Sequence, residues 1–247
     1  MAPRNMLKQQ IRDGEVVVSL RVPIDIDRDA LRAAADKYPY NLIYLDGQHS
    51  PFTEPQLVEF CGFAEELGLP VQMRIPHTKY TYMIGRYLDF GLSAILVPEV
   101  LSRETMLEAV EYTYYPQFGR RSWGGDARFG LKAWDGRAPG RVEYAEWWNE
   151  HVVLAFQVES VEAVTLAKQL AVPGVDYVAF GPNDLWFSLE GHPNFPLKTV
   201  DECMINVAEQ LRDSGLRLGM AIMTAPEERQ KYIDMGITVF QEAPRGA

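Results

Sequence analysis

Residues 152–185 read VVLAFQVESVEAVTLAKQLAVPGVDYVAFGPNDL, and they contain one strand–helix–strand pattern. Two short apolar runs, 152–158 and 177–180, flank an amphipathic segment with helical spacing, SVEAVTLAKQL. Runs that are apolar on both faces are typical of strands buried in a parallel sheet, and parallel neighbours need a crossover between them. This stretch therefore predicts two parallel strands joined by a helix.

The same alternation extends from this unit to both ends of the chain. Further apolar runs are bounded by Gly, Pro or Asp, and amphipathic stretches separate most of them. Stop and cap signals stand at the expected helix ends, as at Gly68, Gly91 and Thr53. The remaining predicted strands are 15–20, 41–45, 70–74, 94–97, 217–221 and 237–240. The remaining predicted helices are 27–38, 53–68, 78–91, 102–115, 200–215 and 225–236.

Eight such repeats in 247 residues predict an α/β fold, a (β/α)8 TIM barrel that forms a single domain over residues 1–247. An open, doubly wound sheet is the structural alternative. No Gly-rich phosphate loop follows the first predicted strand, which disfavours a nucleotide-binding version of the open sheet.

The composition argues against several classes of partner and location. The chain has 24 Lys and Arg against 34 Asp and Glu, a formal net charge of −10, which disfavours nucleic acid and anionic membranes as partners. No apolar run approaches the roughly 18 residues of a membrane helix, and the N-terminus lacks the apolar core of a signal peptide. Cys61 and Cys203 have no C-x-x-C spacing, so reduced, buried thiols are expected. These features predict a cytoplasmic protein.

One long connection, residues 115–151, interrupts the repeat. It contains FGRRSWGGDARFGLKAWDGRAPG, with two glycine clusters, two tryptophans and no clear period. We expect an ordered loop over the mouth of the active site. The alternative is a surface excursion that packs against a neighbouring subunit.

Polar and ionisable side chains stand at the ends of four predicted strands. Functional side chains of (β/α) barrels lie at the carboxyl ends of the strands, so these residues are predicted to share one site. They are His49 in the turn DGQHSP, Arg74, Gln157, Glu159, Asn183 and Asp184.

These residue types suit chemistry beside a metal-bound 2-oxo acid. Glu159 and Asp184 supply hard oxygen ligands for Mg²⁺ or Mn²⁺, and a 2-oxo acid would complete the shell. The metal and Arg74 would stabilise the enolate formed when a C–C bond breaks, and the imidazole of His49 would carry a proton. Each residue also has a structural reading, as a helix-terminal acid, a cap or an ion-pair partner.

Several motifs carry a resemblance to a known family over about residues 7–240. They are YLDGQHSPF, MRIP, LVPEV, YYPQFGRRSWGG, FQVES and FGPNDL. In this order and at this spacing, they resemble the HpcH/HpaI family of class II aldolases. The resemblance implies a phosphoenolpyruvate/pyruvate-type TIM barrel. It also implies a lyase that forms or cleaves 4-hydroxy-2-oxo acids from pyruvate, or a related 2-oxo acid, and an aldehyde.

The resemblance implies a metal-stabilised enolate, with Mg²⁺, Mn²⁺ or Co²⁺, and no Schiff-base lysine. Glu159 and Asp184 match the metal ligands of the family, and Arg74 matches its enolate-stabilising arginine. His49 matches the general acid/base, assisted by an aspartate that corresponds to Asp89. On the substrate side, the resemblance assigns a polar contact to Gln157 and carboxylate binding to the backbone amides of Asn183 and Asp184.

Two features depart from the family pattern. Gln48 stands where the family usually has Glu, which puts the handling of metal-bound water in question. The chain ends at QEAPRGA, where the family continues into a final helix exchanged between subunits, so that helix is expected to be lacking or shortened. A homo-oligomer, trimer or hexamer, is expected. The alternatives are an acyl-CoA lyase-type enolate enzyme and a non-catalytic paralogue that binds an oxo acid.

Overall fold

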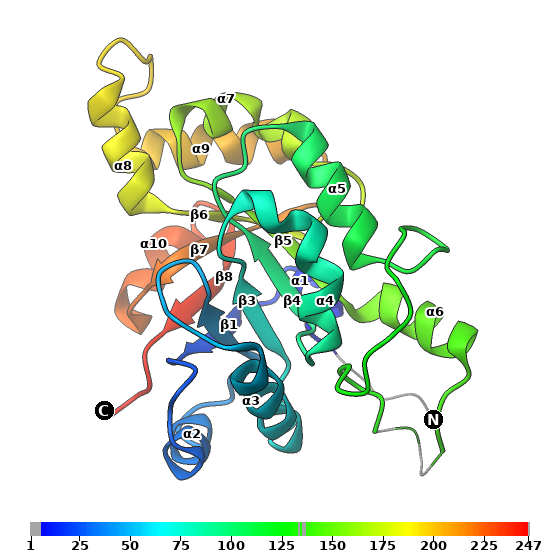
Figure 1. The fold of residues 1–247 in the computed structure, drawn as a ribbon. Helices are drawn as coiled ribbons and strands as arrows, with labels where there is room; N and C mark the ends of the chain where they lie inside the picture. Colours follow the sequence, from blue (N-terminus) through cyan, green and yellow to red (C-terminus); the bar gives the residue numbers. More distant parts are fainter. Residues whose placement is uncertain (1–5, 133, 135–136, 247) are drawn as a thin grey trace.

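The strands form a closed parallel barrel. The computed structural model describes residues 6–132, 134 and 137–246. Each strand pairs with the next and β8 pairs with β1, which confirms the predicted TIM barrel and excludes the open sheet (Figure 1). The strands are β1 (Val17–Arg21), β2 (Leu42–Asp46), β3 (Val71–Arg74), β4 (Ala94–Val97), β5 (Val153–Val158), β6 (Tyr177–Phe180), β7 (Arg217–Met223) and β8 (Ile237–Glu242).

The helices largely follow the predicted segments, with differences at the ends. They are α1 (Leu7–Asp13), α2 (Arg28–Ala35), α3 (Glu54–Glu66), η1 (Thr78–Met83), α4 (Ile84–Asp89), α5 (Arg103–Thr113), α6 (Arg141–His151), α7 (Val161–Leu170), α8 (Pro182–Gly191), α9 (Val200–Leu211), η2 (Pro226–Glu228) and α10 (Arg229–Ile233). Helices α1, α6 and α8 were not predicted, and the helix predicted over 78–91 is a 3-10 turn followed by a short α-helix. Residues 243–246, after β8, form no helix.

Local signals explain several of these boundaries. Helix α3 begins with a capping box, in which Thr53 accepts from the backbone of Gln56 and the Gln56 side chain accepts from the Thr53 backbone. Gly68 and Gly91 follow helices with φ values of 75° and 105°, the left-handed conformation that stops a helix at little steric cost.

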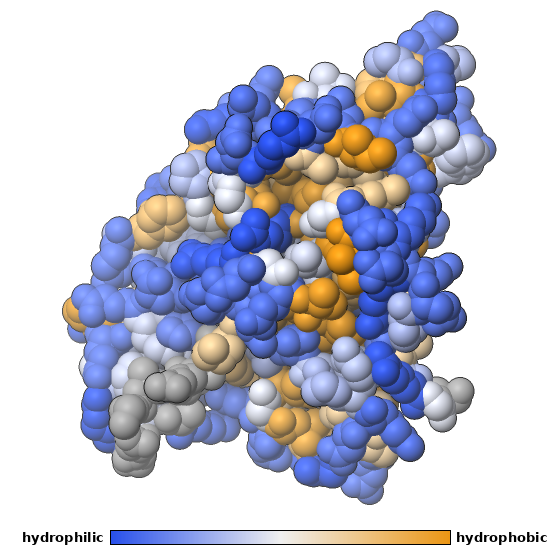
Figure 2. All heavy atoms as spheres, turned by 180° about the vertical axis from the view of Figure 1, so that it is seen from behind, coloured by the Kyte–Doolittle hydropathy of each residue, from blue (hydrophilic) through white to orange (hydrophobic). Residues whose placement is uncertain are grey.

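Apolar side chains fill both faces of the strands. Tyr44, Leu96, Ala155 and Tyr177 belong to a buried cluster inside the barrel, and a larger cluster lies between the strands and the helices. The face seen in Figure 2 is mainly hydrophilic, with hydrophobic patches. Among the described residues, no helix is long and apolar enough to cross a membrane.

The described residues of the connection 115–151 lie at the opposite end of the barrel from the predicted site. It runs from α5 to β5, and a helix-to-strand connection in this fold reaches the amino ends of the strands. Arg121, fully buried, lies over the rings of Tyr115 and Trp148, 4.8 and 4.3 Å from their centroids. Within one chain, the prediction of a loop over the active-site mouth is therefore wrong, because the segment leads into helix α6 and aromatic residues such as Tyr115 and Trp148 are buried in packing.

Candidate active site

Two adjoining hollows open at the carboxyl ends of the strands. The first, of about 290 Å³, is called the central hollow, and its walls come from β1, β2, β3 and β5–β7. The second, of about 470 Å³, is called the side hollow, and its walls come from the loops after β2–β6. His49 and Asp184 line both hollows. The central hollow is also lined by Arg21, Asp46, Arg74, Gln157, Gly181 and Asn183. The side hollow is also lined by Gln48, His77, Thr78, Glu99, Leu101 and Glu159.

Arg74 is fixed in the central hollow by a buried carboxylate. Its Nε and Nη2 donate to the two oxygens of Asp46 at 2.9 and 2.5 Å, and Arg21 donates to the same carboxylate at 3.0 Å. Burial opposes ionisation of Asp46, but the hydrogen bonds and charge of Arg74 outweigh it and lower the pKa of the carboxyl. Asp46 also accepts from the backbone N–H groups of Gln48 and His49. One carboxylate thus orients both the arginine and the histidine turn.

A chain of hydrogen bonds links Arg74 to Glu159. Arg74 Nη1 donates to Gln157 Oε1 at 3.5 Å, and Gln157 Nε2 donates to Glu159. The other oxygen of Glu159 accepts from the backbone N–H of Glu99. Among the described residues, Glu99 is the one non-glycine residue with positive φ, at 51°. A positive φ is unfavourable for a non-glycine residue and persists only where surrounding contacts stabilise it. Here it orients the Glu99 N–H so that it donates to Glu159.

The neighbouring carboxyl groups of Glu159 and Asp184 form a site suited to binding a cation. Burial raises the pKa of Glu159 to about 7, the Glu99 N–H lowers it, and the negative charge of Asp184 raises it further. Within the described ranges, no three His, Cys, Asp or Glu side chains are placed to hold a metal by themselves. Gln48 Oε1 is buried nearby without a hydrogen-bond partner among the described residues. Two carboxylates with open coordination positions suit a divalent ion that takes further ligands from substrate and water.

The N-terminus of α8 completes the central hollow. Gly181 occupies the N-cap position and Pro182 the first turn, where its missing N–H is not needed. The N–H groups of this turn have no acceptor within the helix, so they can bind the carboxylate of a ligand. Asn183 and Asp184 lie in this turn and line the central hollow, and carboxylate binding by their backbone amides stays a prediction.

We expect Gly181→Ala to disturb both neighbours at once. A Cβ at this position would overlap Gln157 Nε2 and lie 2.9 Å from Glu159 Cβ. Overpacking of this kind typically lowers the free energy of unfolding by about 1–3 kcal/mol. Urea unfolding measures the change, with Gly191→Ala as the matched control, because nothing lies within 4 Å of a Cβ there. Equal stability of the two variants would contradict the tight fit at Gly181.

The structure brings together six of the seven predicted site residues and leaves Asp89 apart. Asp89 ends α4, just before β4, and therefore lies towards the amino ends of the strands. It pairs with Arg121 at 2.6 Å, and burial raises its pKa despite that arginine. His49 lies at the opposite end of the barrel, where its backbone N–H donates to Asp46. Asp89 and His49 of one chain are therefore separated by the length of the barrel, and assistance of His49 by Asp89 stays a prediction.

Sequence reasoning missed three residues of the site. Asp46 stood in the quoted turn, and its position beside His49 was the signal that could have found it. Arg21 ends β1, one of the four strands for which no functional residue was predicted. Glu99 lies in LVPEV after β4, and nothing in the sequence indicates its positive φ, because that conformation depends on the tertiary contact with Glu159.

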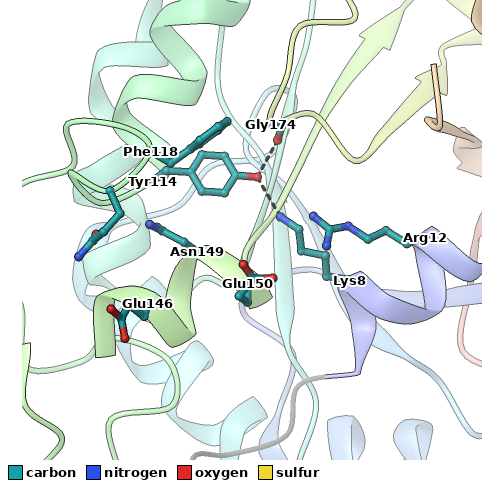
Figure 3. A pocket seen from close by; sticks show the side chains of 9 residues that line it. Lys8, Arg12, Tyr114, Phe118, Glu146, Asn149, Glu150 and Gly174 are labelled. Atoms are coloured by element: carbon teal, nitrogen blue, oxygen red, sulfur yellow. Dashed lines mark hydrogen bonds between the residues drawn. The ribbon is translucent and has the colours of Figure 1, made fainter. Parts of the chain in front are cut away.

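A third cavity, of about 430 Å³, lies at the amino ends of the strands (Figure 3). Lys8 is buried in its wall and donates to Tyr114 and to the carbonyl of Val152, at 2.9 and 2.7 Å. It also pairs with Asp176 at 3.2 Å. Burial lowers the pKa of Lys8 and raises that of Asp176. All three ammonium protons thus have an acceptor, which indicates a structural role.

The chain has relatives among known proteins. A family model described as HpcH/HpaI aldolase/citrate lyase matches residues 25–243. The 2-keto-3-deoxy-L-rhamnonate aldolase of Escherichia coli (strain K12) is 30% identical over 235 residues, which covers 94% of this chain and 84% of that protein. The HpcH/HpaI aldolase from Desulfitobacterium hafniense DCB-2 has a TM-score of 0.83 and 26% identity, covering 96% of this chain and 90% of the other. Citrate synthase SbnG, at 23% identity, TM-score 0.77 and 97% and 91% coverage, shares the fold alone.

Proposed function

The chain belongs to the HpcH/HpaI aldolase/citrate lyase family, and on that premise we propose that it is a metal-dependent class II aldolase. It joins C3 of pyruvate, or of a related 2-oxo acid, to the carbonyl carbon of an aldehyde. C3 loses one proton, the new C–C bond forms, and the aldehyde oxygen takes a proton to become the 4-hydroxyl group. Cleavage is the reverse. The observation that carries the proposal is the central hollow, which an anchored arginine, Arg74, shares with the N-terminus of α8 and with Asp184. Gln157 links this arginine to the neighbouring carboxylate of Glu159.

The 2-oxo acid is expected to bind between Arg74 and the first turn of α8. The N–H groups of that turn donate hydrogen bonds to its carboxylate, while Arg74 stabilises negative charge on the C2 oxygen. Asp46 holds the guanidinium in one orientation, so little reorganisation is needed as charge develops. Glu159 and Asp184 would hold Mg²⁺, Mn²⁺ or Co²⁺, which when bound supplies Lewis-acid stabilisation of the same charge.

His49 is proposed to move the proton of the aldehyde-derived hydroxyl. It lines both hollows, so it lies beside a 2-oxo acid bound in the central hollow and beside an aldehyde that enters from the side hollow. Its backbone N–H donates to Asp46, which ties the histidine turn to the position of Arg74. An imidazole exchanges a proton readily near neutral pH, as this step requires.

Exchange of the pyruvate C3 protons in D₂O tests the proposal without an aldehyde. We expect loss of the methyl signal in proton NMR when enzyme and Mg²⁺, Mn²⁺ or Co²⁺ are present. EDTA should stop the exchange and added metal should restore it, and pyruvate with metal alone is the control. No exchange with any of the three ions would contradict the proposed donor chemistry.

The assembly remains a separate proposal, a homo-oligomer of three or six chains. Helix α8 projects from the barrel (Figure 1), and two large apolar side chains on it are exposed. Trp186 is 51% exposed and Phe187 is 75% exposed. Neighbouring exposed aromatic residues are typical of protein–protein contacts, which supports association of copies through this helix.

A further inference from the structure

Two contacts connect the loops after β3, β4 and β5 along the wall of the side hollow. The first joins His77 Nε2, in the loop after β3, to Glu99 Oε2, in the loop after β4, at 3.1 Å. The second is the hydrogen bond from the Glu99 N–H to Glu159, which follows β5. We call the contact between His77 and Glu99 the brace. Through Glu99, the brace connects the loop after β3 to a proposed metal ligand.

The imidazole of His77 is engaged at both of its nitrogens. His77 caps the N-terminus of η1, where Nδ1 accepts from the N–H of Lys79 at 2.9 Å. Nδ1 is therefore unprotonated, and Nε2 carries the proton that it donates to Glu99. The ring thus has one orientation in which both bonds are made, and in that orientation it holds the side chain of Glu99.

The positive φ of Glu99 decides where its N–H points. Pro98 and Val100 on either side are buried, so rotation of the peptide plane between Pro98 and Glu99 is the simplest movement open to this segment. Half a turn of a peptide plane separates a type II from a type I turn; it exchanges a positive φ for a negative one and reverses the N–H. A residue with a Cβ prefers the negative value. Local preference alone would therefore turn the N–H of Glu99 away from Glu159.

The orientation of Glu159 depends on this N–H. One oxygen of its carboxylate accepts from Gln157 and the other from the backbone of Glu99. Outer partners of this kind orient ligating carboxylates, and their loss typically lowers metal affinity by about 10–100-fold. Because the Glu99 donor belongs to the backbone, its availability is set by the conformation of residue 99.

We propose that His77 is a positioning residue for the metal site, which holds the side chain of Glu99 and thereby keeps the Glu99 N–H directed at Glu159. The inference rests on the proposed aldolase function, in which Glu159 holds the ion. The pair is exposed, with 42% of the His77 side chain and 45% of the Glu99 side chain accessible. Exposed pairs add little to global stability, so we expect the effect in metal binding and not in the free energy of unfolding.

Direct attraction of the ion by the Glu99 carboxylate is the competing explanation. Glu99 lines the same hollow as Glu159 and Asp184, and its charge would favour a cation whatever the backbone conformation. Glycine and alanine at position 99 distinguish the two explanations. Neither residue has a charge or reaches His77, but glycine adopts positive φ at little cost and alanine does not.

Calorimetric titration of Mn²⁺ into the metal-free protein measures binding without substrate. We expect Glu99→Ala to weaken binding about tenfold, at the lower end of the loss typical of outer partners. Glu99→Gly should weaken it less than about threefold, because glycine accepts the required φ. Glu99→Gln should also stay within about threefold, because its carboxamide oxygen still accepts from His77. Equal losses in Glu99→Gly and Glu99→Ala, or a tenfold loss in Glu99→Gln, overturn the inference.

His77→Ala tests the brace from its other side. It should weaken Mn²⁺ binding about three- to fivefold in the wild type, on the scale of one exposed pair. In the Glu99→Gly background, where the pair is already absent, it should change the affinity less than about twofold. His192→Ala is the matched control, because His192 Nε2 lies 3.5 Å from Glu162 in a pair of similar exposure. Equal effects of His77→Ala in both backgrounds overturn the inference, as does an equal effect of His192→Ala.

Pyruvate exchange in D₂O separates this inference from the function on which it rests. The predicted order of Mn²⁺ affinities without exchange in any variant contradicts the aldolase and leaves the brace intact. Exchange by a protein whose Mn²⁺ affinity is unchanged in Glu99→Ala and His77→Ala overturns the brace and leaves the aldolase intact. Failure of the wild type to bind Mg²⁺, Mn²⁺ or Co²⁺ overturns both.

Discussion

Arg74→Lys is expected to lower the rate of pyruvate C3 exchange by about 10²–10³-fold, the loss typical of removing one donor to a developing oxyanion. Lysine keeps the positive charge, but it cannot make the paired bonds to both oxygens of Asp46 while also reaching Gln157. The charge pair with Asp46 survives, so stability should fall by no more than about 1–2 kcal/mol. Proton NMR of pyruvate in D₂O measures the exchange, and urea unfolding measures the stability.

Arg21→Lys is the matched control for this change. Arg21 shares the Asp46 carboxylate, but its side chain is 28% exposed where that of Arg74 is 6% exposed. It makes one hydrogen bond to Asp46 rather than two, so a lysine replaces it more easily. We expect its exchange rate to fall less than tenfold, on the scale of an exposed ion pair. An Arg74→Lys variant with exchange as fast as that of Arg21→Lys would contradict the proposed role of Arg74.

The barrel could be predicted because its signal is local and repeated. Runs such as 153–158 are apolar on both faces, and only a sheet covered on both sides accommodates eight of them. The site could be predicted in outline for the same reason, since the carboxyl ends of the strands converge whatever the side chains are. His49, Arg74 and Glu159 follow from that rule and from the family resemblance together.

The parts that were missed depend on contacts between distant segments. The positive φ of Glu99 arises from a hydrogen bond to a residue 60 positions away, and no local pattern encodes it. The role of Asp46 depends on Arg21 and Arg74 reaching it from neighbouring strands. The glycines and tryptophans of segment 115–151 suggest a loop over the active-site mouth, but the segment joins a helix to the following strand. In this fold such a connection lies at the amino ends of the strands, so its place in the order of elements is the stronger indicator.

Glu159→Gln is expected to remove the response to metal while leaving the chain folded. In the metal-free protein, burial raises the pKa of Glu159 to about 7 from 4.5. The ionised carboxylate therefore opposes folding, and this cost develops as the pH rises from 4.5 through about 7. Full ionisation corresponds to about 3 kcal/mol. Glutamine has no charge to bury, but its amide leaves one acceptor oxygen for the two donors from Gln157 and Glu99. The stability of the metal-free variant relative to the metal-free wild type should therefore rise as the pH increases from 4.5 to 8.

Thermal unfolding with and without divalent ions measures the loss of binding directly. At a metal concentration about 100-fold above Kd, the wild type should gain about 2.7 kcal/mol, or roughly 5–10 °C in Tm. The variant should gain almost nothing, and its pyruvate exchange should fall on the order of 10³-fold, because Lewis-acid stabilisation contributes several kcal/mol. Glu162→Gln, an exposed position three residues along the chain, should keep both responses. A metal-induced rise in Tm that persists in Glu159→Gln would show that the ion binds elsewhere, and the carboxylate pair with Asp184 would then need another explanation.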